Sequence, residues 1–202
     1  MKNKEIIMIL NLISVILLVS CSQRGYADKF TYFVRKCAEK IIIDGVLDDD
    51  AWTISEQIIL KNNRTGESIR NETILTRTKA CYDDENFYVA FECYDPDILS
   101  EYTERDEPLW NQDVVEIFID TDDEMDTYYE IEISPQNVIF DTHIIIPTQI
   151  DVADIAQFNL TGIRTAVFVE GTLNNRADTD HKWTIELAIP FEDFIASSDK
   201  RP

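Results

Sequence analysis

The stretch WNQDVVEIFID, residues 110–120, contains the clearest strand of the sequence and the loop that leads into it. Apolar side chains occupy every second position on one face of the strand, Val115, Ile117 and Ile119, and Val114 and Phe118 flank Glu116 on the other. This period of two predicts a β-strand; over Asn86–Tyr94, where both faces are apolar, it predicts a sheet that is buried on both sides or that lines a site with one of them. Glu116 lies in the middle of the second face, and Trp110 stands in the polar loop just before the strand.

Similar short apolar segments follow one another along the rest of the chain. They predict strands over Thr73–Tyr82, Asn86–Tyr94, Asp113–Asp120, Thr127–Ile133, Val138–Ile146, Ile163–Glu170 and Trp183–Ile189. Short helices are expected over Asp48–Glu56, with Asp48 or Asp49 as N-cap, and over Phe191–Ala196. Many short strands between turn signals predict an all-β fold, an antiparallel β-sandwich of immunoglobulin-like type with short helical turns. No repeat or linker divides residues 40–202, so we expect one domain.

The turn signal at residues 83–86 joins two of these strands and fixes their register. We expect Cys81 to lie opposite Tyr88, and Cys93 to lie opposite Thr76. The two cysteines then point to opposite faces, so a disulfide between them is not expected. Buried free thiols are expected at three positions: Cys37, Cys81 and Cys93.

The N-terminus has the organisation of a bacterial lipoprotein signal sequence. A basic start, MKNK, precedes an apolar run over Ile6–Val19, which is short for a membrane span, and then LVSC, which ends at Cys21. LVSC resembles a lipobox, whose cysteine is lipidated. Residues 1–21 are therefore expected to be the signal peptide with its lipobox cysteine, and residues 22–39 a tether with the strand that leads into the domain. The alternatives are a plain secretory peptide and an uncleaved anchor.

The charge balance limits the classes of partner. Among 202 residues, 39 are acidic and 18 are basic, which gives a formal net charge of −21. Nucleic-acid binding depends on lysine and arginine, so this excess argues against it. It also disfavours electrostatic docking on anionic lipid. We therefore expect an exported protein that contacts the bacterial envelope only through its N-terminal lipid, on the outer-membrane or periplasmic side.

Trp110 and Glu116 form the best candidate site. A loop tryptophan offers a flat apolar surface on which a sugar ring stacks, and a nearby carboxylate accepts hydrogen bonds from sugar hydroxyls. Neither interaction requires a positive charge. The competing interpretation is that Trp110 plugs the end of the sandwich and Glu116 pairs with an arginine.

Other chemistry has weaker support in the sequence. No nucleophile elbow, phosphate loop, HExxH or dinucleotide motif is present. A carboxylate-based glycosidase using residues such as Glu116 and Glu130 is the alternative function. Two oxygen-rich clusters are candidates for Ca²⁺, although neither has EF-hand spacing and both are compatible with solvated turns: Asp44, Asp48, Asp49 and Asp50, and Asp120, Asp122, Asp123 and Glu124.

Four motifs in a fixed order carry a family resemblance. IDGVLDDDAW (43–52), YDDENFYV (82–89), Asp95-Pro96 and the opening stretch (110–120) resemble motifs of carbohydrate-binding module family 9. The resemblance implies a DOMON-like antiparallel sandwich that binds sugar chains without catalysis and that holds calcium. It places Trp110 on the first of two sugar-clamping tryptophans and Glu116 on a carboxylate that binds sugar hydroxyls.

The same resemblance gives structural roles to the remaining tryptophans and shows where this sequence differs from the family pattern. Trp52 falls on a structural tryptophan, and Trp183 is expected in the core. Glu130 stands in the strand where the family has a sugar-contacting arginine. The second clamp tryptophan and a late strand would lie beyond Pro202, so we expect either a fragment that lacks both or a divergent member of the family with a weakened or different site. Related sandwiches bind haem, which makes Met125 with His143 a third, electron-transfer hypothesis.

The leading prediction combines these observations. We expect an exported lipoprotein that binds a plant-type polysaccharide such as xylan or cellulose, or their oligosaccharides, in carbohydrate catabolism. The partner is a glycan, and no catalytic residue is expected.

Overall fold

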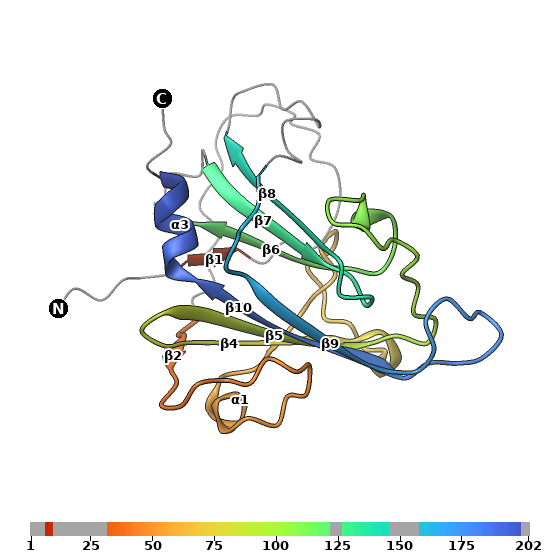
Figure 1. Ribbon diagram of the computed structural model, residues 1–202. Helices are drawn as coiled ribbons and strands as arrows, with labels where there is room; N and C mark the ends of the chain where they lie inside the picture. Colours follow the sequence, from red (N-terminus) through yellow and green to blue (C-terminus); the bar gives the residue numbers. More distant parts are fainter. Residues whose placement is uncertain (1–6, 10–31, 122–126, 146–157, 199–202) are drawn as a thin grey trace, which may run out of the picture.

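The computed structural model describes residues 7–9, 32–121, 127–145 and 158–198. Two β-sheets lie face to face, one above the other in Figure 1. The small sheet has the order β1–β6–β7–β8: Ile7–Ile9, Val115–Asp120, Thr127–Ile133 and Ile139–Ile145. The large sheet has the order β2–β4–β5–β10–β9: Arg35–Lys36, Thr76–Tyr82, Asn86–Tyr94, Lys182–Pro190 and Arg164–Glu170. A two-residue strand, β3 (Ile58–Ile59), also pairs with β4.

The predicted antiparallel β-sandwich is confirmed. All paired strands are antiparallel except β2 and β4, which run parallel over two residue pairs. Strand β7 has the predicted bounds at both ends. The segment predicted to start as a strand at Thr73 begins instead with a 3₁₀ turn, η1 (Glu72–Ile74), because the side chain of Asn71 caps it by accepting from the Thr73 N–H.

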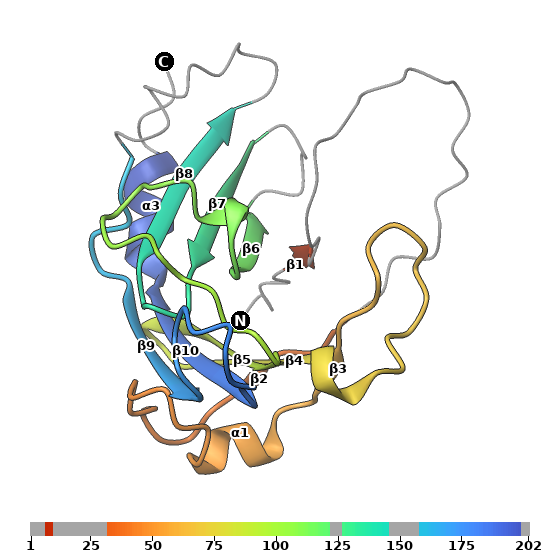
Figure 2. The same ribbon diagram turned by 90° about the vertical axis from the view of Figure 1, so that its right-hand side faces the viewer.

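The helices lie outside the space between the sheets. Helix α1 (Asp50–Ile54) covers the side of the large sheet that faces away from the small sheet, and α3 (Phe191–Ser198) lies at one end of the sandwich (Figure 1, Figure 2). Asp49 is the N-cap of α1 but makes no side-chain cap. Its carboxylate accepts from the Ile42 N–H at 3.1 Å instead.

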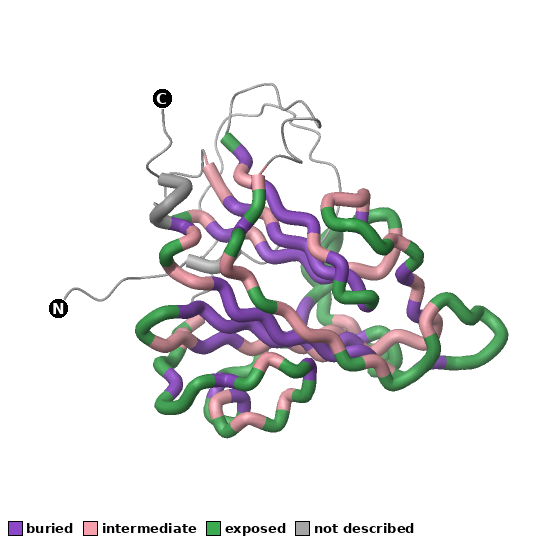
Figure 3. The backbone as a smooth tube through the Cα atoms, in the orientation of Figure 1, coloured by how far each residue is buried: buried purple, intermediate pink, exposed green. Residues whose placement is uncertain are grey.

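The inner faces of the two sheets form the hydrophobic core, visible as the buried strands of Figure 3. The small sheet contributes Ile117, Ile131 and Ile133, and the large sheet contributes Phe87, Val89, Phe91, Trp183, Ile185 and Leu187. Trp183 is a core residue, as predicted. Because inward and outward residues alternate on β6 and β7, burying this set leaves their other residues on the outer surface of the small sheet.

The hairpin register and the cysteines agree with the predictions. Cys81 lies opposite Tyr88 and Cys93 lies opposite Thr76. The thiols of Cys37, Cys81 and Cys93 are free and buried. Burial raises the pKa of both Cys81 and Cys93, so these thiols stay protonated at neutral pH.

The outer face of the large sheet is covered by the segment 41–54, which is tied down by one buried carboxylate. Glu186 is fully buried on β10. It accepts hydrogen bonds from the backbone N–H groups of Asp44 and Gly45 at 3.0 and 2.9 Å, and from Nε1 of Trp52 at 2.7 Å. Trp52 is 1% exposed, which confirms its predicted structural role. The motif IDGVLDDDAW therefore supplies the donors that dock this segment.

Replacing Gly45 by alanine is expected to lower the free energy of unfolding by about 1–3 kcal/mol. The residue has a φ of +85°, and a Cβ atom would lie 2.7 Å from the backbone nitrogen of Phe168. Gly66 is a matched control, since its φ is +70° but nothing lies within 4 Å of its Cβ position. Urea unfolding of the two variants measures the difference. Equal losses of stability in the Gly45 and Gly66 variants would contradict the close approach of the Phe168 backbone at Gly45.

A short part of the predicted signal sequence pairs with the small sheet in this full chain. Strand β1 is antiparallel to β6, with Met8 opposite Ile119. A signal peptide is expected to be removed and so to take no part in the fold, whereas residues 7–9 of the full chain pair with β6. The physical reason is that β6 offers an unpaired edge, to which an extended apolar segment can add. Cleavage after residue 20 stays a prediction. Within the described ranges, no helix is long and apolar enough to cross a membrane.

Candidate functional site

The outer face of the small sheet carries the predicted site residues. Pairing of β6, β7 and β8 aligns the outward side chains in two rows: Glu116, Glu132 and Phe140 in the first, and Phe118, Glu130 and Thr142 in the second. Glu116, Glu130 and Glu132 therefore lie together, and we call them the carboxyl cluster. Phe118 packs edge-on against Tyr128 beside them, with ring centroids 5.8 Å apart.

Trp110 lies at the end of the first row and displays its ring. It belongs to the 3₁₀ turn η2 (Leu109–Asn111), which is anchored by the fully buried Leu109 in a small cluster with Val138 and Phe140. The Trp110 ring packs edge-on against Phe140, with centroids 5.3 Å apart and an interplanar angle of 81°. The side chain stays 47% exposed. The ring is therefore presented on the outer face and does not plug the sandwich.

Two members of the carboxyl cluster are shielded from water. Glu116 is 7% exposed and Glu132 is 1% exposed, and the two residues face each other across β6 and β7. Burial raises the pKa of Glu132 to about 9, and the neighbouring charges of Glu116 and Glu130 add to this effect, while the Trp110 backbone N–H opposes it. Burial and the charge of Glu116 also raise the pKa of Glu130 to about 7. Near neutral pH, Glu132 is therefore a neutral carboxylic acid.

Replacing Glu132 by glutamine is expected to flatten the dependence of stability on pH. The folded pKa of Glu132 is above its ordinary value, so the folded state holds the proton more tightly than the unfolded chain. The resulting stability is fully present below the unfolded pKa and is lost as pH rises through the folded value. Between about pH 5 and about pH 9, the free energy of unfolding of the wild type should fall by about 2–4 kcal/mol. That of Glu132→Gln should not show this fall. Thermal melts of both proteins across this pH range test the prediction. If stability depended on pH in the same way in both proteins, the raised pKa of Glu132 would be refuted.

Other residues singled out in the sequence lie elsewhere. His143 points toward the core and stacks on Tyr129, with centroids 4.5 Å apart, while His181 pairs with Glu170 on the surface. Met125 lies outside the described residues, so the haem hypothesis stays untested.

The acidic clusters predicted for calcium show no metal-binding arrangement where the structure describes them. Asp44 accepts from the Val46 N–H at 2.8 Å, and Asp49 accepts from Ile42, so these carboxylates stabilise turns. Over the described parts of the chain, no group of three or more His, Cys, Asp or Glu side chains is placed to hold a metal ion. Asp122, Asp123 and Glu124 lie outside those parts, and calcium at the second cluster stays a prediction.

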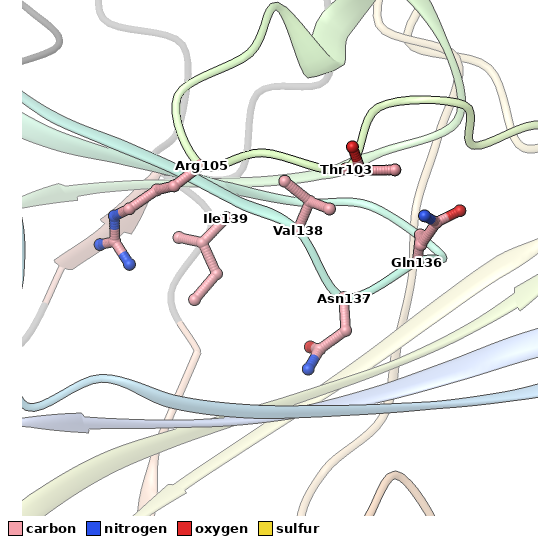
Figure 4. Close-up of a pocket in the computed structure, with 6 residues that line it drawn as sticks. All are labelled: Thr103, Arg105, Gln136, Asn137, Val138 and Ile139. Carbon is pink, nitrogen blue, oxygen red and sulfur yellow. The ribbon is translucent and has the colours of Figure 1, made fainter.

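A cavity of about 280 Å³ lies at the turn between β7 and β8 (Figure 4). Thr103 and Arg105 line one side, and residues 136–139 line the other. Arg105 forms an ion pair with the fully buried Asp141. The lining holds no aromatic ring that could stack on a sugar, so this cavity is a weaker candidate than the face beside Trp110.

The sequence pointed to only part of the site. Glu132 and Phe140 were not among the predicted residues. The alternation in β7 places Glu130 and Glu132 on one face, which is a usable signal. That Glu132 faces Glu116 depends on the register between β6 and β7, and six residues of sequence, 121–126, separate these two strands.

Comparisons with known proteins found partial similarity to a xylanase and to solved carbohydrate-binding modules. A stretch of 89 residues is 37% identical to part of endo-1,4-beta-xylanase A from Thermotoga neapolitana, covering 44% of this chain and 8% of that enzyme. A family 9 carbohydrate binding module from Caldicellulosiruptor kristjanssonii, solved with cellotriose, is 20% identical with a TM-score of 0.47, over 79% of this chain and 66% of that one. The same module solved with glucose is 21% identical, with a TM-score of 0.45, over 78% and 67% of the chains.

The decisive comparison is with family models. The model of the family described as "Carbohydrate family 9 binding domain-like" matches residues 43–201, which is most of the chain and includes all four motifs. The prediction of a non-catalytic protein is confirmed at the level of the family, which is one of binding domains. The chain belongs to the carbohydrate family 9 binding domain-like family.

Proposed function

We propose that this domain binds a polysaccharide such as xylan or cellulose, or their oligosaccharides, and holds the chain without cleaving it. The observation that carries the proposal is the half-exposed ring of Trp110 beside the carboxyl cluster on the outer face of the small sheet. Family membership supports a carbohydrate ligand. The similarity to part of an endo-1,4-beta-xylanase supports a β-1,4-linked chain.

The binding chemistry follows from the two kinds of side chain. One face of a pyranose ring is apolar, and stacking on Trp110 contributes about 0.5–2 kcal/mol. A carboxylate such as Glu116 accepts hydrogen bonds from sugar hydroxyls, which orients the ring. A single stacking ring with few hydrogen bonds supports dissociation constants on the order of 0.1–1 mM. Such weak single contacts suit a long polymer that offers many equivalent units.

We also propose that the protein is exported and lipid-anchored through Cys21. The basic start, the apolar run and LVSC support this. Mass spectrometry of the mature protein from its native membrane tests it, and an N-terminal lipid on Cys21 is the expected result. A mature protein that retains residues 1–20, or that lacks lipid, would overturn it.

Titration calorimetry and affinity electrophoresis test the proposed binding. The full chain is expected to be retarded in gels that contain soluble xylan or a soluble cellulose derivative, and to release heat with their oligosaccharides. A gel without polysaccharide is the control. Absence of binding to every glycan would overturn the proposal. Release of reducing sugar during long incubation would overturn its non-catalytic part.

A further inference from the structure

The face beside Trp110 contains more acceptor groups than a stacking site for a neutral sugar needs. Glu116 faces Glu132 across neighbouring strands, and Glu130 lies two residues along β7 on the same side. The described outward positions of β6, β7 and β8 carry carboxyl, aromatic, aliphatic and hydroxyl groups, and no lysine, arginine or histidine. Glu130 therefore supplies negative charge on this face as it ionises near neutral pH, while Glu132 stays protonated.

Two polar atoms on this face are buried and have no hydrogen-bond partner. Oε2 of Glu132 has none, and the side chain is 1% exposed. Oγ1 of Thr142 has none either; the residue is 2% exposed and stands opposite Glu130. Buried polar groups are almost always paired, and these two lie on adjacent strands of one face. Both flank Glu130, so a donor bound there would satisfy them.

The side chains of this face limit which kind of hydrogen-bond donor a ligand can bring there. Among the described residues, no three carboxyl groups are arranged to hold a metal ion, so a metal ion is a poor fit. A hydroxyl supplies one donor and no charge, whereas an ammonium group supplies three donors and a full positive charge. Glu130 is partly exposed, so a ligand reaches the cluster there while its ring lies on Trp110.

We propose that this face selects an amino sugar, a β-1,4-linked glycan whose 2-amino groups are protonated, over a neutral glycan with the same backbone. The ammonium group sits at Glu130 and donates toward Glu132, and Trp110 stacks on the ring that carries it. The net charge of −21 adds long-range attraction for such a polycation. This inference rests on the proposed carbohydrate binding and names the substrate class of that same site.

Calorimetry with three hexasaccharides tests the proposal, because they share one backbone and differ at carbon 2: glucosamine, N-acetylglucosamine and glucose oligomers. The full chain is expected to bind the glucosamine hexamer at least about tenfold more tightly than cellohexaose, with the N-acetyl hexamer close to cellohexaose. Glu130→Gln and Glu132→Gln should bring the ratio of the two affinities towards one. Glu67→Gln, an exposed carboxylate elsewhere, should leave the ratio unchanged.

The outcomes separate this inference from the proposed function. Binding of cellohexaose equal to or tighter than that of the glucosamine hexamer overturns the amino-sugar preference and leaves carbohydrate binding in place. A preference that survives both glutamine variants also overturns it, because the attraction would then come from net charge alone. No binding to any of the three oligomers overturns both.

Discussion

Replacing Glu186 by alanine is expected to lower the free energy of unfolding by about 3–5 kcal/mol. The carboxylate is fully buried and accepts from the N–H groups of Asp44 and Gly45 and from the Trp52 indole. The alanine variant leaves these three donors without an acceptor and opens a cavity beneath the docked segment. Losses of this size unfold many domains of marginal stability.

Two further variants serve as comparisons for this prediction. Glu186→Gln retains one carbonyl oxygen but turns an NH₂ group towards donors. Its free energy of unfolding should therefore lie between those of the wild type and of Glu186→Ala. Glu67→Ala removes an exposed carboxylate and should change stability by less than about 0.5 kcal/mol. Urea denaturation of the three variants provides the comparison. A loss below about 1 kcal/mol for Glu186→Ala would show that the motif segment is not held by this carboxylate.

Local patterns in the sequence predicted the fold well because strands and tight turns are local. The alternation over Thr127–Ile133 gives β7 with its bounds, and the turn at residues 83–86 gives the register of β4 with β5. The short strands β2 and β3 have two residues each, which is too short to show a period.

Contacts between distant residues explain what the sequence did not reveal. Glu186 accepts from Trp52, 134 positions away, so nothing near Glu186 marks it as the acceptor for the motif. Asp49 has the sequence of a helix cap, but its carboxylate accepts from Ile42, because the preceding segment folds back over it. The family resemblance located Trp110 and Glu116, while their setting among Glu132 and Phe140 required the strand register.

Replacing Trp110 by alanine is expected to weaken glycan binding about two- to thirtyfold, which takes a dissociation constant on the order of 0.1–1 mM towards the limit of detection by calorimetry. The reason is that the variant removes the stacking surface of the outer face, where each stacked ring contributes about 0.5–2 kcal/mol. Stability should fall by only about 1 kcal/mol, because the ring is 47% exposed and loses one edge-on contact with Phe140.

Phe168 provides a matched control for this variant. Its side chain is also 47% exposed, and it lies on β9 with its neighbours Val167 and Val169 packed against the core, so its own side chain points away from the small sheet. Phe168→Ala should therefore leave affinity unchanged, and Trp110→Phe should retain part of it. Wild-type affinity in Trp110→Ala would remove Trp110 from the site. Equal loss in both alanine variants would mean that the effect comes from the fold, since two exposed aromatic rings on opposite faces cannot both stack on one bound sugar.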